Sequence, residues 1–286
     1  MRNLITVASP IAVPAERLGQ QMSTMLQSLL RLLEAEIPAN PRSRKNVNAA
    51  ERLEREMRRY FRALEDAFPW GQVENIYYRY GKESIGRDTG DMRDTGDMMD
   101  TLLGAFSGYL TYKVIGHLAA VHMSGMAEMV TWGKTKAGVP IAYEGPPISQ
   151  AVNWAEKHGA TLVTQMDEET KRRIATTVSD AIKNKRGVPG LSRDLRGMFG
   201  DMSRYRSRMI ARTETAFALS HASLGAMKDM GIEGKEWIVA DDPCEICSGN
   251  GSDGVIPIGQ AFSSGDMAPP QHPNCRCAVA PALLRR

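Results

Sequence analysis

The stretch Ser43–Phe68, SRKNVNAAERLEREMRRYFRALEDAF, repeats apolar side chains at steps of three and four residues. Its apolar positions are Val47, Ala50, Leu53, Met57, Tyr60, Leu64 and Phe68. Because this spacing follows the turn of an α-helix, these side chains share one face. Pro69 ends the pattern, since proline cannot continue a helix. The stretch predicts an amphipathic helix with one side buried in a helical core.

Helical spacing extends over much of the remaining chain. The predicted helices are 15–36, 167–182 with Asp167 as its N-cap, a short helix capped by Ser192, and a longer helix from Ser203 to a terminal glycine, Gly231. Residues 236–240, EWIVA, are the clearest strand. The sequence therefore predicts a mainly α protein whose strand structure lies near the C-terminus.

Turn-forming residues predict two loops. Gly and Pro cluster in GKTKAGVPIAYEGPP, residues 133–147, which favours a linker. We expect it to divide a helical N-terminal region, residues 1–150, from an α+β C-terminal domain, residues 151–286. The hexapeptide RDTGDM occurs twice in residues 87–98, and Asp-Thr-Gly favours an exposed loop. Its aspartates could attract a hard cation, but they lack the spacing of a calcium loop.

The segment most similar to a membrane span is Leu102–Val121, LLGAFSGYLTYKVIGHLAAV. Lys113, near its centre, and His117 would be costly in hydrocarbon, so a buried or partner-facing helix is expected. The first residues have no long apolar run after a basic region, so no secretory signal is visible. We expect synthesis in the cytoplasm and no membrane partner.

The formal net charge of +3 conceals a strongly basic segment. Residues 171–212 contain twelve Lys or Arg and three Asp, a local balance of +9. The candidate contacts for nucleic acid or another partner are Lys171, Arg172, Arg173, Lys185, Arg186, Arg193, Arg196, Arg204, Arg206 and Arg208. Such a segment can neutralise phosphates without reading sequence. An acidic protein surface or solvent would suit the same charges.

All four cysteines lie within the last 43 residues. Cys244-x2-Cys247 is followed by His272-x2-Cys275, and each spacing lets two side chains reach one tetrahedral ion. We predict a structural zinc site with these four ligands, with Cys277 as the alternative fourth ligand. Disulfides and buried thiols remain open, although a cytoplasmic setting disfavours disulfides. Such a site would hold together the strand and loops around the cysteines, and we call this small part of the C-terminal domain the strand-loop knuckle.

Signatures of catalysis are missing from the sequence. Pro243-Cys244-x2-Cys247 matches half of a zinc deaminase signature, but no His-x-Glu precedes it. No Gly-rich phosphate loop, Gly-x-Ser-x-Gly or His-Glu-x-x-His occurs. Arg212 and Glu214 stand two apart on a predicted helix, so they are expected to contact different neighbours. We expect no enzyme and no small-molecule substrate; a metal-dependent nucleic-acid enzyme is the weaker alternative.

Four pieces follow one another in order between about Thr161 and Ala278. They are MDEETKRRIATTVSDAI, GVPGLSRDLRGMF, the segment Ile210–Thr215 that opens a helix ending at Gly231, and the Trp237 strand that leads to the cysteines and HPNCRC. This ordered set resembles the phage Mu F-like minor head protein family, also called the phage head morphogenesis domain. In this resemblance Arg212, Glu214 and Trp237 are structural motif residues.

The resemblance implies a minor capsid protein of a tailed bacteriophage that acts in head morphogenesis near the portal. Some members of the family act in DNA packaging or ejection. The implied partners are the portal protein and the major capsid protein, with packaged double-stranded DNA as a neighbour. The implied location is the capsid interior or the portal vertex, after assembly in the bacterial host cytoplasm. The alternative is a zinc-clamped, sequence-nonspecific DNA-binding protein.

Overall fold

Helices dominate the part of the chain that the computed structural model describes, residues 37–82, 90–136, 148–282 and 284. The helices are α2 (Arg44–Asp66), α3 (Trp70–Lys82), α4 (Gly90–Thr135), α5 (Ile148–Lys183), α6 (Gly187–Asp201), α7 (Ser207–Asp229) and α8 (Glu245–Ser252). They all belong to one compact unit, Pro38–Arg286. The predicted helix over 15–36 lies outside the described residues.

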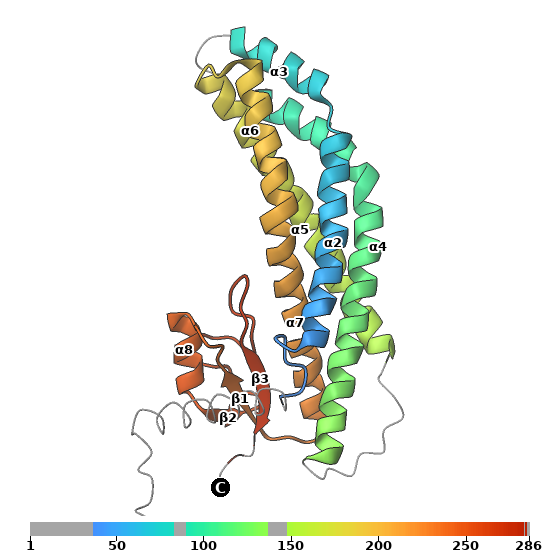
Figure 1. Cartoon of the computed structure of the whole chain (residues 1–286), viewed down its shortest axis with the longest axis vertical. Coiled ribbons are helices and arrows are strands. Elements are labelled where there is room, and N and C mark those ends of the chain that lie inside the picture. The colour runs from blue at the N-terminus through green and yellow to red at the C-terminus, as the bar shows by residue number, and fades with distance from the viewer. Residues whose placement is uncertain (1–36, 83–89, 137–147, 283, 285–286) are drawn as a thin grey trace, which may run out of the picture. The chain divides into compact units, whose positions relative to one another are not determined.

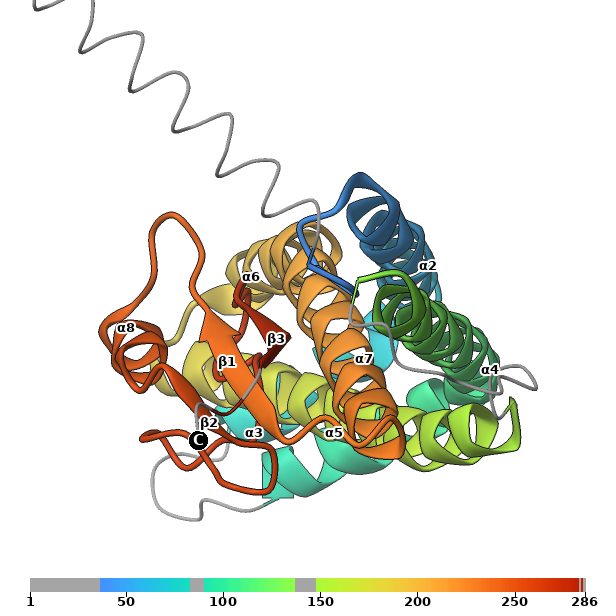
Figure 2. The same ribbon diagram turned by 90° about the horizontal axis from the view of Figure 1, so that it is seen from below.

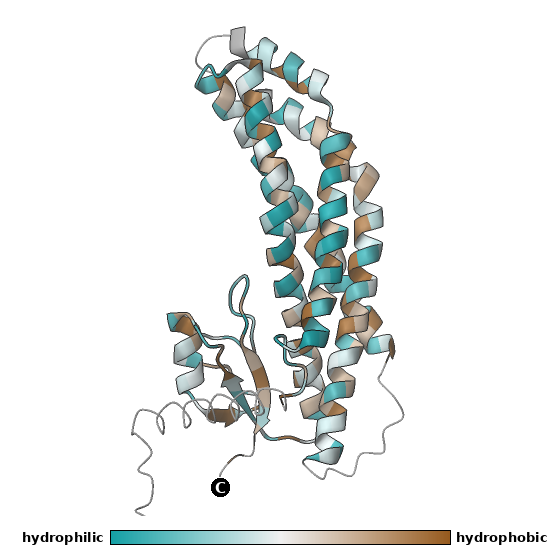
Figure 3. Cartoon of the chain, viewed as in Figure 1, coloured by the Kyte–Doolittle hydropathy of each residue, from teal (hydrophilic) through white to brown (hydrophobic). Residues whose placement is uncertain are grey.

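Helices α2, α4, α5 and α7 pack lengthwise into a bundle (Figure 1). Their apolar faces turn inward and their polar faces turn outward (Figure 3). Helices α3 and α6 pack against α5 at the end of the bundle that lies farthest from the sheet. No described helix is both long enough and apolar enough to cross a membrane. Burial of the apolar stripes is the main stabilising contribution in such a bundle.

Helix α2 confirms the prediction made from residues 43–68. The Ser43 hydroxyl accepts a hydrogen bond from the backbone N–H of Asn46 and so caps the helix N-terminus. The predicted apolar positions Leu53, Met57 and Leu64 are fully buried. The helix ends at Asp66, just before Pro69, as the proline requires.

The prediction of an exposed loop at the RDTGDM repeat was wrong for its second copy, residues 93–98, which is helical and lies in α4. Thr95 and Met98 are buried there. Because the acidic positions recur every three residues, close to one helical turn, they fall on one side of α4. Asp94 pairs with Arg79 at 2.7 Å and Asp100 with Lys171 at 2.8 Å. Tertiary ion pairs and burial have overridden the local turn preference.

Helix boundaries in the C-terminal half also differ from prediction. Asp167 lies inside α5, where its carboxylate accepts hydrogen bonds from the hydroxyls of Tyr60 and Ser107, and burial raises its pKa. Ser192 lies inside α6, which begins at Gly187. Asp and Ser are common helix caps, which is why the sequence favoured that role for both residues. The same residue types also occur inside helices when their side chains find other partners.

Helix α6 continues into α7 through a π-helical turn, η1 (Met202–Arg206). The extra residue in this turn lets the Ser207 hydroxyl donate to the Met202 carbonyl at 3.0 Å. Helix α7 ends as predicted at Gly231, whose φ of 70° suits glycine. The N–H of Ile232 donates back to the Met227 carbonyl at 2.9 Å and completes the cap.

A three-stranded antiparallel sheet follows α7, with strand order β2-β1-β3. Its strands are β1 (Gly234–Ile238), β2 (Val255–Pro257) and β3 (Ala278–Ala282), so the predicted strand at 236–240 begins two residues earlier. Figure 2 shows the sheet beside the end of α7, which β3 contacts. Trp237 on β1 is buried against Phe262 and three of the cysteines. The predicted fold class, mainly α with a small strand-loop knuckle, is confirmed.

The predicted division near residue 150 falls within the bundle. Residues 137–147, most of the predicted linker, lie outside the described residues. Helices α4 and α5 flank this segment and pack closely, and one buried cluster includes residues from Ala39 to Leu219. The helices on both sides therefore share a core. The division into two domains at residue 150 stays a prediction.

A glycine sets the close approach of α4 and α5. A Cβ atom on Gly159 would lie 2.9 Å from Cγ1 of Ile115, which is too short for an ordinary contact. We expect Gly159→Val to lower the free energy of unfolding by about 1–3 kcal/mol through overpacking, as measured by urea denaturation. Gly197→Val is the matched control, because that helical position opens to empty space. Equal stability of the two variants would contradict this packing.

Candidate metal centre and basic groove

The cysteines and His272 come together at the edge of the sheet. Cys244 is the N-cap of α8, and its sulfur accepts the backbone N–H of Cys247 at 3.4 Å. Cys247 lies in the first turn of α8, while Cys275 and Cys277 belong to the segment that leads into β3.

The ligand atoms form two overlapping groups around Cys247. Those of Cys244, Cys247 and His272 lie within 4.8 Å of one another, as do those of Cys247, Cys275 and Cys277. The Cys247 sulfur is 3.8 Å from the Cys275 sulfur and 3.6 Å from Nε2 of His272. Ligands of one tetrahedral zinc ion are separated by about the same distances, because Zn–S is ~2.3 Å and Zn–N ~2.0 Å.

The orientation of His272 fits a metal ligand. Its Nδ1 lies 2.9 Å from the Pro273 carbonyl oxygen, so the proton resides on Nδ1 and is donated to that oxygen. Nε2 is then left with its lone pair directed at the Cys247 sulfur. Histidine ligands of zinc are commonly held by this second hydrogen bond.

The thiols compete for negative charge. A hydrogen bond from Cys275 and the Ala240 backbone lower the pKa of Cys277 to about 5. Burial, and then the charge on Cys277, raise the pKa of Cys247 to about 12. The hydrogen bond to Cys277, together with burial, raises the pKa of Cys275. Of these three thiols only Cys277 has a lowered pKa, and a bound cation would stabilise the neighbouring sulfurs as thiolates too, so the residues could hold a metal ion. The ion's identity and the fourth ligand stay predictions.

The predicted basic contacts are spread over α5, α6, η1 and α7, and most contact other protein groups. Arg206 is buried: its guanidinium donates to the Thr170 hydroxyl at 3.0 Å and the Met166 carbonyl at 3.3 Å. The other contacts are Lys171 with Asp100, Arg172 and Arg173 with Glu169, Arg186 with Asp194, Arg196 over the Trp70 ring, Arg204 with the Gly200 carbonyl, and Arg208 with Glu54. Lys185 and Arg193 are exposed.

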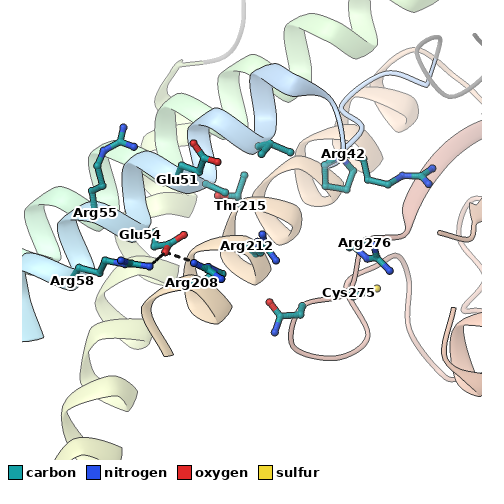
Figure 4. Close-up of a pocket in the computed structure, with 14 residues that line it drawn as sticks. Arg42, Glu51, Glu54, Arg55, Arg58, Arg208, Arg212, Thr215, Cys275 and Arg276 are labelled. Carbon is teal, nitrogen blue, oxygen red and sulfur yellow. Dashed lines mark hydrogen bonds and ion pairs between the residues drawn. The ribbon is translucent and has the colours of Figure 1, made fainter. Parts of the chain in front are cut away.

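A groove of about 810 Å³ lies between α2, α7 and the loop that carries Cys275 (Figure 4). Six arginines line it, against two glutamates: Arg42, Arg55, Arg58, Arg208, Arg212 and Arg276, with Glu51 and Glu54. The loop is attached to α7 by a hydrogen bond from the Asn274 N–H to the Thr213 hydroxyl, at 3.0 Å. We call this feature the arginine groove.

Residues 172–280 match the model of the family described as Phage Mu protein F like protein. This segment is a phage Mu F-like domain. The match confirms the resemblance found in the sequence and indicates a phage head morphogenesis protein. It covers fewer than half of the residues and includes most of the basic segment and the whole cysteine cluster. No curated protein and no solved structure matches the chain.

Within the Mu F-like domain the three motif residues have separate contacts. Glu214 pairs with His158 of α5 at 2.6 Å, whereas Arg212 lines the arginine groove. Glu214 therefore has a partner on another helix, whereas the prediction of a neighbour for Arg212 stays a prediction. Trp237 forms the buried centre of the knuckle, beside the cysteines. Glu214 thus links α7 to α5, and Trp237 packs within the sheet region.

The arginine groove was missed by sequence reasoning. Arg42 immediately precedes the stretch Ser43–Phe68, and Arg55 and Arg58 belong to it. Arg276 lies between two predicted metal ligands, Cys275 and Cys277. These segments precede or end the Mu F-like domain and meet Arg212 only in the folded chain. The excess of arginine over glutamate near Ser43–Phe68 was the only signal of the groove in the sequence. The sequence did not indicate that α7 and the loop with Arg276 would pack beside these arginines.

Proposed function

We propose that the protein is a minor head protein of a tailed phage, built into the capsid interior or the portal vertex. The observation that carries this proposal is the Mu F-like match over residues 172–280. A bundle that joins this domain to residues 38–171 in one core supports a role as a rigid connecting part. The portal protein and the major capsid protein are the proposed partners.

The proposed role is structural rather than enzymatic. The cysteine cluster supports this view, because Cys247, Cys275 and Cys277 are buried and protein residues offer enough ligands for a closed site. Closed zinc sites with four protein ligands stabilise folds, whereas catalytic sites keep one position open to substrate. In this proposal zinc joins α8 to the segment that leads into β3 and takes no part in a reaction.

The protein's presence in particles tests the proposal. We expect gradient-purified virions to contain it at low copy number, detectable by mass spectrometry. Deleting its gene should reduce the yield of mature heads, and supplying the gene in trans should restore it. A major capsid protein measured in the same gradient serves as the reference. Absence of the protein from virions, with normal particle assembly in the deletion, would reject a structural role.

A DNA-binding protein is the second candidate. Lys185 and Arg193 are exposed and have no ion pair with a described residue, which leaves two cations in the basic segment for phosphates. Binding through phosphates should weaken steeply as salt increases, because counterions are released on binding. A duplex-binding assay at low and moderate salt tests this candidate, and an unchanged affinity would count against it.

A further inference from the structure

The arginine groove has unused positive charge. Glu54 accepts hydrogen bonds from both Arg58 and Arg208, so those three side chains largely satisfy one another. Arg212 and Arg276 are exposed, and neither makes an ion pair or hydrogen bond with another described residue. Guanidinium groups pair in bidentate fashion with carboxylates and phosphates. The groove therefore has two available sites for an oxyanion, on facing elements.

The shape and the walls of the groove favour a peptide over duplex DNA. Its volume of about 810 Å³ lies in the range of ligand pockets, and it would admit a few residues of extended chain. Val47, Ala50 and Pro41 contribute apolar surface between the arginines, which suits aliphatic side chains. Glu51 and Glu54 line the α2 side and would repel a continuous row of phosphates.

The loop that carries Arg276 is held in place from both ends. Asn274 adopts a positive φ of 61°, and its N–H donates to Thr213 on α7. Cys275 and Cys277, the neighbours of Arg276, are buried in the cysteine cluster. Arg276 is thus set opposite α2 by the cluster and by α7, so the groove exists before a ligand arrives. Such preorganisation lowers the cost of binding.

We propose that the arginine groove binds an acidic peptide segment with interspersed apolar residues, contributed by a partner protein. Carboxylates of the segment pair with Arg212 and Arg276, and an aliphatic side chain contacts Val47. The peptide chemistry follows from the groove alone; only the assumption that the segment belongs to another head protein rests on the proposed function.

A fluorescence anisotropy titration of the full chain tests this proposal. The probe is a fluorescein-labelled peptide of about 12 residues that alternates Glu and Leu, and the reference peptide has Gln for Glu. We expect the Glu peptide to bind, and Arg212→Gln with Arg276→Gln to weaken it about tenfold or more. The matched control, Arg93→Gln with Lys157→Gln, removes two exposed charges outside the groove and should change affinity less than about twofold.

The outcomes separate the alternatives. Equal weakening by both double variants, or equal binding of the Gln peptide, would overturn the proposal, since neither depends on groove carboxylate pairing. A duplex of roughly 20 base pairs that displaces the peptide, and loses its own binding in the groove variant, would make the groove a nucleic-acid site instead. Circular dichroism confirms that the variants fold. Absence of the protein from virions would leave the peptide result unchanged, so the two proposals fail independently.

Discussion

We expect Cys247→Ala to abolish metal binding at the proposed zinc site and to disorder the C-terminal knuckle. Cys247 is fully buried and belongs to both groups of potential ligands, so its loss leaves no complete set. Structural zinc contributes on the order of 10 kcal/mol to the folding of small zinc domains, far more than the small sheet could replace. Elemental analysis should find about one zinc per chain in the natural protein and almost none in Cys247→Ala.

The matched control is Ser248→Ala, an exposed neighbour on α8 that should keep its metal. Cys275→Ala, Cys277→Ala and His272→Ala then identify the fourth ligand, because only true ligands should reduce the metal content strongly. Less than about 0.3 metal per chain in the natural protein would favour thiols or disulfides over a metal site. Chelation followed by limited proteolysis would show whether the knuckle alone opens or the bundle opens with it.

Acidification will destabilise the bundle through two histidines of α4, His122, which is buried, and His117, which is half-buried. Burial, and then the charge of Arg52, lower the pKa of His117 to about 4; burial, and then His221, lower that of His122 to about 4. Unfolded histidine titrates near pH 6.5, so the unfolded chain gains protons first as the pH falls. The stability contributed by these neutral rings is fully present above pH 6.5 and is lost between pH 6.5 and about 4.

Each histidine should cost roughly 1.4 kcal/mol per pH unit in that window. Other groups act on the same measurement. The hydrogen bond with Arg172 is the main reason why the pKa of Glu169 is lowered to about 2, so Glu169 reduces the free energy of unfolding only as the pH falls below 4.5. Burial raises the pKa of Asp167, so protonation of this carboxyl favours the folded state as the pH falls. Urea denaturation at pH 7, 6 and 5 therefore excludes Glu169. The pKa of His221, which burial lowers, and that of Asp167 act in the same direction in the variant and in the natural chain, so the comparison with the variant below separates them from His117 and His122.

The variant His117→Gln with His122→Gln should flatten this pH dependence, because glutamine cannot take up the proton. In the natural chain, His117 lies 3.1 Å from the Thr215 hydroxyl and His122 lies 3.1 Å from His221. A glutamine side chain is chosen because its amide can form hydrogen bonds with the same two partners. The natural chain is the reference. His272 is left unchanged because it belongs to the cysteine cluster. An unchanged slope in the double variant would assign the acid sensitivity to other groups.

Local patterns predicted those elements whose determinants lie within the element. The stretch Ser43–Phe68 contains its cap, its apolar stripe and its stop, so α2 was predicted almost to the residue. Gly231 likewise carries its own conformational requirement. The second RDTGDM copy failed because its turn preference is weak compared with the burial of Met98 and the ion pairs from α3 and α5. Asp167 failed because its partners, Tyr60 and Ser107, are distant in sequence.

The candidate metal centre shows both sides of this distinction. The spacing of Cys244 with Cys247, and of His272 with Cys275, was enough to predict a shared site, because each pair sits within one turn of chain. The choice between Cys275 and Cys277 was not readable, since both sulfurs reach Cys247 only after β3 pairs with β1. The orientation of His272 depends on a backbone carbonyl that sequence spacing does not place.

By itself the sequence determined the helical class, the family of the C-terminal segment and the location of the cysteine site, because periodicity, ordered motifs and short-range ligand spacing are all properties of neighbouring residues. Only the tertiary structure decided which charges are used. In the folded chain most cations of the basic segment contact other protein groups, and Arg206 is buried. Arg212 and Arg276, by contrast, line one groove together with residues of α2. The reason is that charge acts through space, and distances between residues far apart in the chain exist only after the bundle and the knuckle have packed together.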